Sequence, residues 1–349
     1  MAGSSDSDRS PGRDPFPPVE KLRPGLWTVP VPLPNNSLRY VFVYVFETDR
    51  GVYLVDAGWN TDEAYAALGA GLAQAGYAMG DVQGVLVTHI HPDHYGLAGR
   101  IREASGAWIA LHPADAALIH ARYAEPTDLL ERVGGMLRRA GAPEDEIATL
   151  RGAAMPVRPF VDAVLPDVLL EDGARPEVPG WDLSAIWTPG HSPGHLCFWE
   201  PANQVLLTGD HVLPRITPNI SFHPQAGADP LGDFLRALDK LDPYEPREVM
   251  PAHEHRFFGL HRRLDELRAH HAERFREVLA AIADGDVTGW AIARRMAWSR
   301  PWDAIEGFMR RAALGEALAH LRALEQRGLV HEVVGEPSHW HLTDRAAGG

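Results

Sequence analysis

The sequence predicts an α/β protein with an additional helical part at its C-terminal end. Short runs of β-branched, aromatic and aliphatic residues alternate with helical patterns up to residue 258, which indicates helices layered on sheets. Several strand patterns end in histidine or aspartate, which indicates a metal site at the strand ends. We expect a main domain over residues 19–258, a linker helix over 259–284 and a small domain over 285–349.

Composition limits the class of protein. With 349 residues, 45% of them hydrophobic, the chain is long enough for one large domain and a smaller one. The net charge of −14 disfavours nucleic acid and anionic membrane surfaces as partners. No apolar run approaches the roughly 18 residues of a membrane span, and no signal-peptide pattern is present. A single cysteine, Cys197, excludes an intramolecular disulfide and favours a cytoplasmic location.

The N-terminal part begins as a tail and continues as a sheet with helices. Residues 1–18 are rich in Ser, Asp, Gly and Pro, which predicts a disordered tail. Strands are predicted over residues 26–33, 38–48, 51–56, 85–87 and 107–111, the first three antiparallel. Helices are predicted over residues 62–75, 96–104 and 113–123. Thr61 or Asp62 caps the first helix, and Gly76 ends it.

Residues 124–160 are rich in Arg, Glu, Gly and Ala and predict a helical insertion, or lid. Helices are expected over residues 128–139 and 144–150. Long insertions beside a site commonly shape the substrate pocket. Met136, Leu137 and Met155 either line such a pocket or only pack the insertion onto the main domain.

The second half repeats the strand pattern and then becomes helical. Strands are predicted over residues 164–170, 181–188, 196–200, 205–207 and 248–250, and a helix over 230–241. Residues 260–283 carry apolar side chains at three- and four-residue steps, which predicts one long amphipathic helix. Further helices are predicted over residues 287–296, 302–309 and 312–327, and a hairpin over 329–334 and 340–342. Cys197 lies inside a predicted strand, so we interpret it as a small core residue.

Four side chains with metal-ligand chemistry follow the buried strand at residues 85–87. They are His89, His91, Asp93 and His94. Imidazoles and carboxylates are typical zinc ligands. Pro92 predicts a tight loop that points them inward. Since a zinc ion takes three or four ligands, others must come from elsewhere in the chain.

Later strand ends supply candidates for these further ligands. His191 and His195 lie in a loop constrained by Pro and Gly, and Asp210 follows a strand. Asp56 also lies at a strand end, where its carboxylate serves either the turn or a nearby metal ligand.

The pattern His-x-His-x-Asp-His at residues 89–94 resembles the signature of the metallo-β-lactamase superfamily, and residues 188–195, 208–210 and 251–255 resemble its later motifs. The resemblance implies a four-layer αββα sandwich as the catalytic domain and a dinuclear centre, with zinc as the expected metal and iron or manganese as alternatives. It implies the following ligand set: His89, His91 and His191 for one ion, Asp93, His94 and His253 for the second, and Asp210 bridging both. His195 and Asp56 are then support residues that hydrogen-bond the ligands.

The chemistry implied by this resemblance is hydrolysis. Two cations about 3.5 to 4 Å apart share a water, lower its pKa towards 7 and supply hydroxide at neutral pH. Asp93 orients this hydroxide or carries a proton to the leaving group, which makes it the expected catalytic residue. Asp210 stands where one class of true metallo-β-lactamases has cysteine, so a small-molecule thioester or other carboxylic ester is the expected substrate. A lactone is the alternative, although Leu213 stands where some family lactonases carry tyrosine.

The C-terminal helices and hairpin resemble the winged-helix module of the lactamase-beta-like branch of the superfamily. This leaves a metal-dependent nuclease, or a DNA-binding regulator with a vestigial site, as alternatives. From residue 285 onward, eight Arg and no Lys face eight acidic residues, without the basic excess of nucleic-acid binding.

Apolar side chains in this module indicate that it packs against another surface. A leucine stripe at positions 314, 318, 321 and 324 demands burial, and Trp298 and Trp302 offer apolar surface. We therefore expect the module to form a homodimer or to shape the pocket. His223 and His255 are interpreted as pocket or surface residues.

Overall fold

The computed structural model describes residues 16–34 and 36–347. Most of the predicted tail, residues 1–15, lies outside the described residues. Phe16 packs edge-on against Tyr40, with 5.4 Å between the ring centroids.

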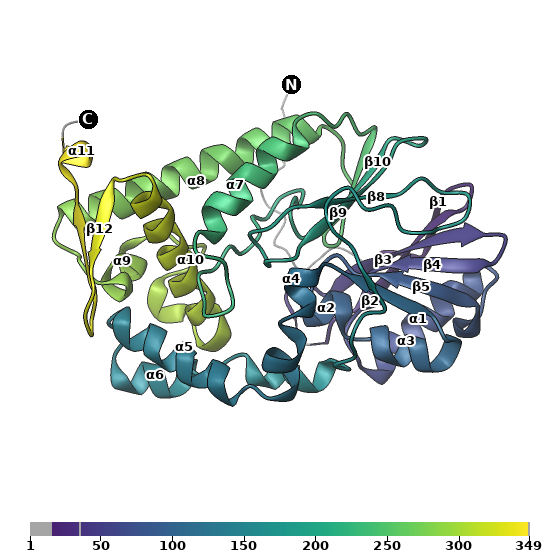
Figure 1. Ribbon diagram of the computed structural model, residues 1–349, viewed down its shortest axis with the longest axis horizontal. Coiled ribbons are helices and arrows are strands. Elements are labelled where there is room, and N and C mark those ends of the chain that lie inside the picture. Colours follow the sequence, from purple (N-terminus) through teal and green to yellow (C-terminus); the bar gives the residue numbers. More distant parts are fainter. Residues whose placement is uncertain (1–15, 35, 348–349) are drawn as a thin grey trace, which may run out of the picture.

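Two β-sheets form the centre of the fold (Figure 1). Within the described residues, the larger sheet contains, in spatial order, β1 (Glu20–Arg23), β2 (Leu26–Pro32), β3 (Tyr40–Thr48), β4 (Gly51–Val55), β5 (Val82–Leu86), β6 (Trp108–Leu111) and β7 (Val168–Leu169). Strands β1 to β4 are antiparallel and β4 to β7 are parallel. The antiparallel order was predicted for β2 to β4, whereas β1 was not predicted. The second sheet has the order β11 (Glu248–Pro251), β10 (Val205–Gly209), β9 (Leu196–Glu200) and β8 (Ser184–Trp187).

Alternation along the strands builds the layers. Val41, Val43 and Val45 of β3 face one apolar core, whereas Phe42 and Tyr44 face the core between the two sheets. Helices α1 (Asp62–Gln74) and α3 (Ala98–Ser105) share the first core. Helices α7 (Pro230–Leu241) and α8 (Leu260–Ala283) cover the outer face of the second sheet. The order helix, sheet, sheet, helix confirms the predicted four-layer αββα sandwich.

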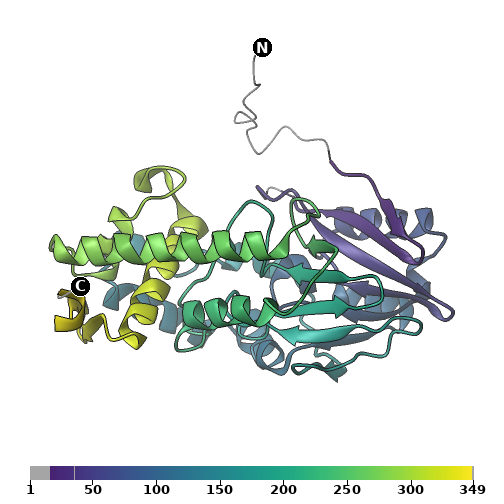
Figure 2. The ribbon, with the colours of Figure 1, turned by 90° about the horizontal axis from the view of Figure 1, so that it is seen from above.

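The insertion and the C-terminal helices share one apolar core with α7 and the second sheet. The insertion contains α5 (Thr127–Arg139), α6 (Glu144–Leu150) and the 3₁₀ helix η3 (Met155–Phe160). The C-terminal lobe, residues 260–347, contains α8, α9 (Gly289–Arg295), η4 (Trp302–Ala304), α10 (Gly307–Gln326), the hairpin β12 (Val330–Val333) and β13 (His339–Leu342), and α11 (Asp344–Ala347). Figure 2 shows this lobe at one end of the sandwich. The helical region and hairpin are present as predicted, while the winged-helix likeness stays a prediction.

The predicted leucine stripe is buried inside this shared core, as is Trp302. These side chains therefore pack within the chain and do not support a dimer. The homodimer stays a prediction, but the leucine stripe and Trp302 no longer support it.

Several predicted elements differ from the observed ones, and local chemistry accounts for part of the difference. Pro166 lacks an N–H for a sheet ladder, and only the short β7 forms within the predicted strand 164–170. The predicted helix 113–123 is divided into α4 (Pro113–Ala116) and a π-helical turn, η2 (His120–Ala124). The predicted helix 302–309 is wrong, because the chain is extended at Ile305 and Glu306 between η4 and α10. Ile305 is buried in the shared core, so packing overrides helix propensity there.

Three further features complete the fold. A short 3₁₀ helix, η1 (Met79–Asp81), precedes β5. The loop predicted at Pro92 is instead a helical turn, α2 (Pro92–Tyr95), which begins at the proline. No helix within residues 16–34 and 36–347 is both long and apolar enough to cross a membrane.

Candidate metal centre

The predicted ligands come from several separate segments and meet at one place. His89 and His91 lie between β5 and α2, and Asp93 and His94 belong to α2. His191 lies between β8 and β9, Asp210 follows β10 and His253 follows β11. Their side chains form three groups within each of which the ligand atoms lie within 4.8 Å of one another: His89 with His91 and His191, His89 with His94 and Asp210, and Asp93 with His94 and His253.

Three of the imidazoles are fixed by a hydrogen bond at Nδ1. His94 Nδ1 donates to Asp56 Oδ2 over 2.8 Å. His191 Nδ1 and His253 Nδ1 donate to the carbonyl oxygens of Asn219 and Tyr40, each over 2.9 Å. Each bond sets the tautomer and leaves Nε2 with a lone pair, which is how proteins usually orient a metal-binding histidine.

The nitrogens left over point at carboxylates but form no hydrogen bonds. Nε2 of His94, His191 and His253 and Oδ1 of Asp210 are buried without a hydrogen-bond partner among the described residues. His253 Nε2 lies 3.2 Å from Asp93 Oδ2, and His191 Nε2 lies 3.4 Å from Asp210 Oδ2. Two ligands of a tetrahedral zinc ion, each about 2.1 Å from it, lie about 3.4 Å apart. The spacing therefore fits donors that share a cation.

The electrostatics divide the site into a neutral and an acidic part. Burial, and then neighbouring imidazoles, lowers the pKa of His89 and of His91 well below the usual value, so both are neutral and able to coordinate. Burial alone would lower the pKa of His94, but Asp93, Asp56 and Asp210 outweigh it and raise that pKa well above its usual value. The carboxylates thus make the second part of the site favourable for positive charge.

His89 and His91 are neighbours within the first group. His89 Nε2 lies 2.9 Å from His91 Nδ1, and one ring nitrogen of each residue lies within 4.8 Å of a ring nitrogen of His191. His89 Nδ1 contacts the hydroxyl of Thr88 at 3.0 Å.

Asp56 contacts one predicted ligand, His94, directly and a second, His89, through the hydroxyl of Thr88. Its carboxylate accepts hydrogen bonds from His94 Nδ1, from the backbone N–H of Thr88 at 2.8 Å and from the Thr88 hydroxyl. Asp56 has a φ of 66°, a left-handed conformation that aspartate tolerates better than most residues. Asp56 thus hydrogen-bonds His94 directly, and its role as a support residue stays a prediction.

His195 uses both ring nitrogens within the protein. Its Nε2 accepts from the backbone N–H of Asp210 at 3.1 Å, and its Nδ1 donates to the Thr188 hydroxyl at 2.9 Å. No lone pair is left for a metal. Gly209 is required beside it, because a Cβ there would lie 2.7 Å from His195 Nε2.

Comparison with known proteins gives the family. The model of the metallo-beta-lactamase superfamily matches residues 37–253, which is more than half of the chain and includes every predicted ligand. The chain belongs to the metallo-beta-lactamase superfamily.

Solved structures of this superfamily extend the likeness beyond the matched segment. The structure of a metallo-beta-lactamase family protein from Thermus thermophilus is 34% identical, has a TM-score of 0.80, and covers 93% of this chain and 100% of its own. That of a beta-lactamase domain protein from Burkholderia ambifaria is 25% identical, with a TM-score of 0.78 and coverage of 93% and 94%.

Curated relatives match over part of their length. The probable metallo-hydrolase YqjP of Bacillus subtilis is 28% identical over 61% of this chain and 66% of its own length. An atrochrysone carboxyl ACP thioesterase of Cryptosporiopsis sp. is 28% identical over 42% of this chain and 46% of its own. The chain thus matches about half to two thirds of these two curated relatives.

Asp115 is a buried support residue that the sequence pattern did not reveal. Its carboxylate accepts from Ile90 N–H at 2.9 Å, from the Ser192 hydroxyl at 2.7 Å and from Gly194 N–H at 2.7 Å. It therefore joins the first ligand loop of this superfamily centre to the loop of His191. Asp115 lies in a predicted helix without a motif around it, and no local signal could have identified it.

Other predicted candidates lie outside the ligand groups. His255 is exposed, and Cys197 is fully buried in a strand, as expected for a core residue. Met136 and Leu137 are buried in the shared core. Of the two alternatives for the insertion, these two residues therefore follow the one in which they pack it onto the rest of the chain and do not line a pocket.

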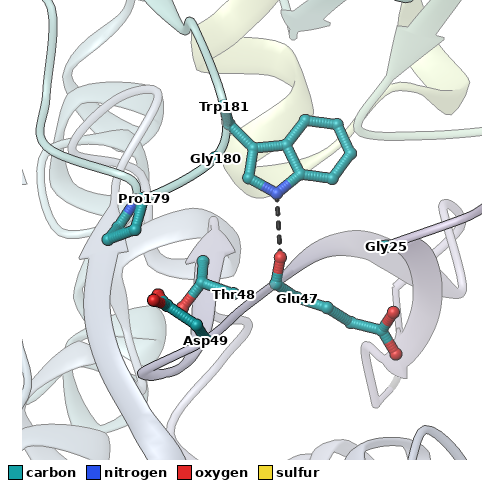
Figure 3. Close-up of a pocket in the computed structure, with 7 residues that line it drawn as sticks. All are labelled: Gly25, Glu47, Thr48, Asp49, Pro179, Gly180 and Trp181. Carbon is teal, nitrogen blue, oxygen red and sulfur yellow. Dashed lines mark hydrogen bonds between the residues drawn. The ribbon is translucent and has the colours of Figure 1, made fainter.

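A surface pocket of about 490 Å³ lies away from this centre (Figure 3). Trp181 Nε1 donates to the carbonyl of Glu47 across its wall, at 2.9 Å. Thr48 and Asp49 of its lining form the turn that enters β4, whereas Asp56 follows the other end of that strand. Five strand residues span about 16 Å, so this pocket is separate from the metal centre.

Proposed function

We propose that the protein is a metal-dependent hydrolase that uses two zinc ions to cleave a thioester or another carboxylic ester of a small molecule. The observation that carries this proposal is the set of buried, unpaired ligand atoms on His94, His191, His253 and Asp210. Buried polar atoms without partners are unfavourable in a native protein, and two bound cations would together give each of these atoms a partner.

The ligand assignment that we propose follows the groups of converging atoms. His89, His91 and His191 would hold one ion, Asp93, His94 and His253 the other, and Asp210 would lie between them. When bound, such a pair lowers the pKa of water and polarises the oxygen of the scissile carbonyl. Zinc agrees with the nitrogen-rich donor set, with iron or manganese as alternatives.

Asp93 is the carboxylate that we assign to proton transfer. Its side chain retains 14% exposure, whereas that of Asp56 retains 2% and is occupied by Thr88 and His94. Burial raises the pKa of Asp93, but His94 and His253 outweigh it and hold the pKa well below its usual range. Asp93 is therefore ionised and able to accept a proton from water and to donate it to the leaving group.

The choice of an acyl substrate rests on the donor set and on the relatives. Asp210 supplies a carboxylate at the bridging position, and two of the relatives are named as thioesterases. Lactones share the carbonyl chemistry and are the second candidate. Buried Leu213 offers no hydroxyl to a lactone ring, which favours the open ester.

Elemental analysis combined with a substrate screen tests the proposal. The purified protein should contain about two zinc ions per chain, and the metal-loaded protein should hydrolyse thioesters faster than lactones and phosphodiesters. A metal content of zero after growth with ample zinc, or turnover of a phosphodiester alone, would contradict it. The latter result would favour the nuclease.

Two wider expectations are part of the proposal. We infer a cytoplasmic location from the single buried thiol, since Cys197 is best kept reduced there. Measurement of the molar mass in solution would test the homodimer through residues 285–349.

A further inference from the structure

Two arginines without acidic partners lie beside the metal centre. Arg122 belongs to η2 and Arg311 to α10, and both are partly buried. Neither forms an ion pair with a carboxylate among residues 16–34 and 36–347. The neighbouring Arg310, by contrast, pairs with Glu146 and donates to the carbonyl of Ile305. Among the described residues, other arginines such as Arg138 and Arg294 also form no ion pair, but these are exposed, whereas Arg122 and Arg311 are partly buried.

Arg122 is attached to the first ligand loop. Its guanidinium carbon lies 5.9 Å from the centroid of the Tyr123 ring. The Tyr123 hydroxyl donates to the carbonyl of Ile90 over 2.7 Å, and Ile90 stands between the ligands His89 and His91. Arg122 is therefore fixed at the His91 side of the centre.

A loop of the chain brings Arg311 to the same side. The carbonyl of Asn219 accepts from His191, and two residues later Ser221 packs on Gly315 of α10, where a Cβ would lie 1.8 Å from the Ser221 oxygen. Two residues of extended chain span about 7 Å. Arg311 lies one helical turn before Gly315 on the same face of α10. Figure 1 shows α10 on the side of the C-terminal lobe that faces α2 and α4.

The electrostatics agree with this arrangement. Burial, and then the charge of Arg122, lowers the pKa of Arg311 to about 10. Burial, and then the charges of Arg122, Arg311 and His191, lowers the pKa of His223 to about 3. These groups therefore lie within electrostatic reach of one another.

Two like charges held close together and partly removed from water are unfavourable unless an anion joins them. We propose that Arg122 and Arg311 bind an anionic group of the substrate, a carboxylate or a phosphate, while the scissile carbonyl lies at the metal centre. This inference rests on the proposed function. Guanidinium groups match both anions through paired hydrogen bonds. His223 Nδ1 accepts from the N–H of Gln225 at 3.2 Å, so its Nε2 carries a proton and adds a donor.

Matched substrates that differ in charge test the proposal and identify the source of the anion. The N-acetylcysteamine thioesters of succinate and butyrate differ by a carboxylate on the acyl side. The butyryl thioesters of 4′-phosphopantetheine and pantetheine differ by a phosphate on the thiol side. We expect the wild type to prefer the charged member of one pair at least tenfold in kcat/KM. Arg122→Gln and Arg311→Gln should each reduce this preference at least tenfold, mainly through a higher KM for the charged member.

Arg294→Gln is the control, because Arg294 is an exposed arginine of the same lobe. It should change neither pair. Equal turnover of charged and neutral members by the wild type, or a preference that survives both substitutions, would overturn the anion site.

Calorimetry with inorganic phosphate separates this inference from the proposed function. If the metal-loaded wild type hydrolyses no ester or thioester, the proposed function fails. The anion site would still stand if phosphate binds the wild type at least tenfold more tightly than Arg311→Gln, and it fails if the two affinities are equal. Phosphate that coordinates the metals contributes to both proteins and cancels in this comparison.

Discussion

The metal centre and the core of the C-terminal lobe both bury histidines, but they use them differently. In the lobe, His271 Nδ1 lies 3.2 Å from His320 Nε2, and His320 Nδ1 donates to the carbonyl of Glu316 at 2.8 Å. Burial lowers the pKa of His271 to about 2 and that of His320 to about 3, so the two rings are neutral. Three of the four ring nitrogens hydrogen-bond each other or the backbone, and His271 Nε2 has no partner among the described residues.

At the metal centre, the rings hydrogen-bond the surrounding protein and leave Nε2 directed at ionised carboxylates. Among the described residues, no group of three ligand atoms converges in the lobe. A cluster of buried histidines is therefore a candidate metal site only where unpaired lone pairs and carboxylates meet. Substitutions at the metal centre should therefore change activity or metal binding, whereas substitutions in the lobe should change only stability. Four predictions test this difference.

The largest effect is expected for Asp93→Asn. The amide keeps a coordinating oxygen but loses the charge and the ability to accept a proton, so kcat should fall about 10²- to 10⁴-fold while most of the metal is retained. Rates on the best ester from the screen, measured together with metal content, check this. Asp128→Asn, an exposed change in the insertion, is the control and should have the wild-type rate. Near-normal kcat in Asp93→Asn with full metal would show that the assigned role is wrong.

His195→Ala should weaken metal retention more than it slows the metal-loaded enzyme. The imidazole accepts from Asp210 N–H and is held by Thr188, so its loss should loosen the carboxylate of Asp210, which we propose to lie between the two ions. Loss of such a supporting residue typically weakens metal binding about 10- to 100-fold. Competition against a chelator measures the affinity. His320→Asn is the counterpart in the lobe and should leave the metal affinity unchanged. If both variants lose metal affinity equally, the buried histidines of the two regions do not differ in the way argued above.

The sequence identified the proposed ligands, whose side chains converge in the structure, more readily than the residues that hydrogen-bond them, for a physical reason. Ligands such as His89 and His253 lie in short motifs at strand ends, and residue type, spacing and strand position are all local. Asp115 joins loops that are 25 and 79 residues away from it, and only the folded chain brings them together. Arg311 reaches the centre from the far end of the chain for the same reason.

Element prediction succeeded where the pattern was periodic and failed where packing decided. The long helix α8 and the hairpin were predicted nearly to the residue. The helix predicted over residues 302–309 was lost, because burial of Ile305 holds the chain extended before α10. The leucine stripe of α10 correctly predicted burial, but a single sequence could not say that the partner surface lies in the same chain.

Asp115→Asn should destabilise the protein while changing kcat less than Asp93→Asn does. The carboxylate of Asp115 accepts hydrogen bonds from two backbone N–H groups, and the amide of asparagine would turn its own N–H towards one of them. We expect this to lower the free energy of unfolding by about 2 kcal/mol. Urea unfolding of metal-loaded protein measures the cost. The control Asp229→Asn keeps a side-chain oxygen at a helix cap outside the centre and should cost much less, since aspartate and asparagine cap helices about equally well. Equal stability of Asp115→Asn and the wild type would exclude the role in joining the two loops.

The smallest effect concerns Glu316 in the lobe, and it depends on pH. Burial raises the pKa of Glu316 to about 7 from its ordinary 4.5, so the folded protein binds this proton more tightly than the unfolded chain does. Stability from this group is therefore present below pH 4.5, decreases as the pH rises to about 7, and is absent above it. The full shift corresponds to at most about 3 kcal/mol, and the exposure that Glu316 retains reduces this to roughly 1 kcal/mol.

Glu316→Gln should consequently be more stable than the wild type at pH 8 by about 1 kcal/mol and equal to it near pH 4.5, with unchanged kcat. Urea unfolding at the two pH values measures this, with the exposed Glu306→Gln as the control. Metal binding has its own pH dependence, because protons compete for the histidine ligands. That contribution is common to the wild type and both variants, so it cancels when they are compared at one pH. A gain at pH 8 with unchanged kcat would place this titration in the lobe alone; a change in metal content or kcat would mean that the two regions are coupled.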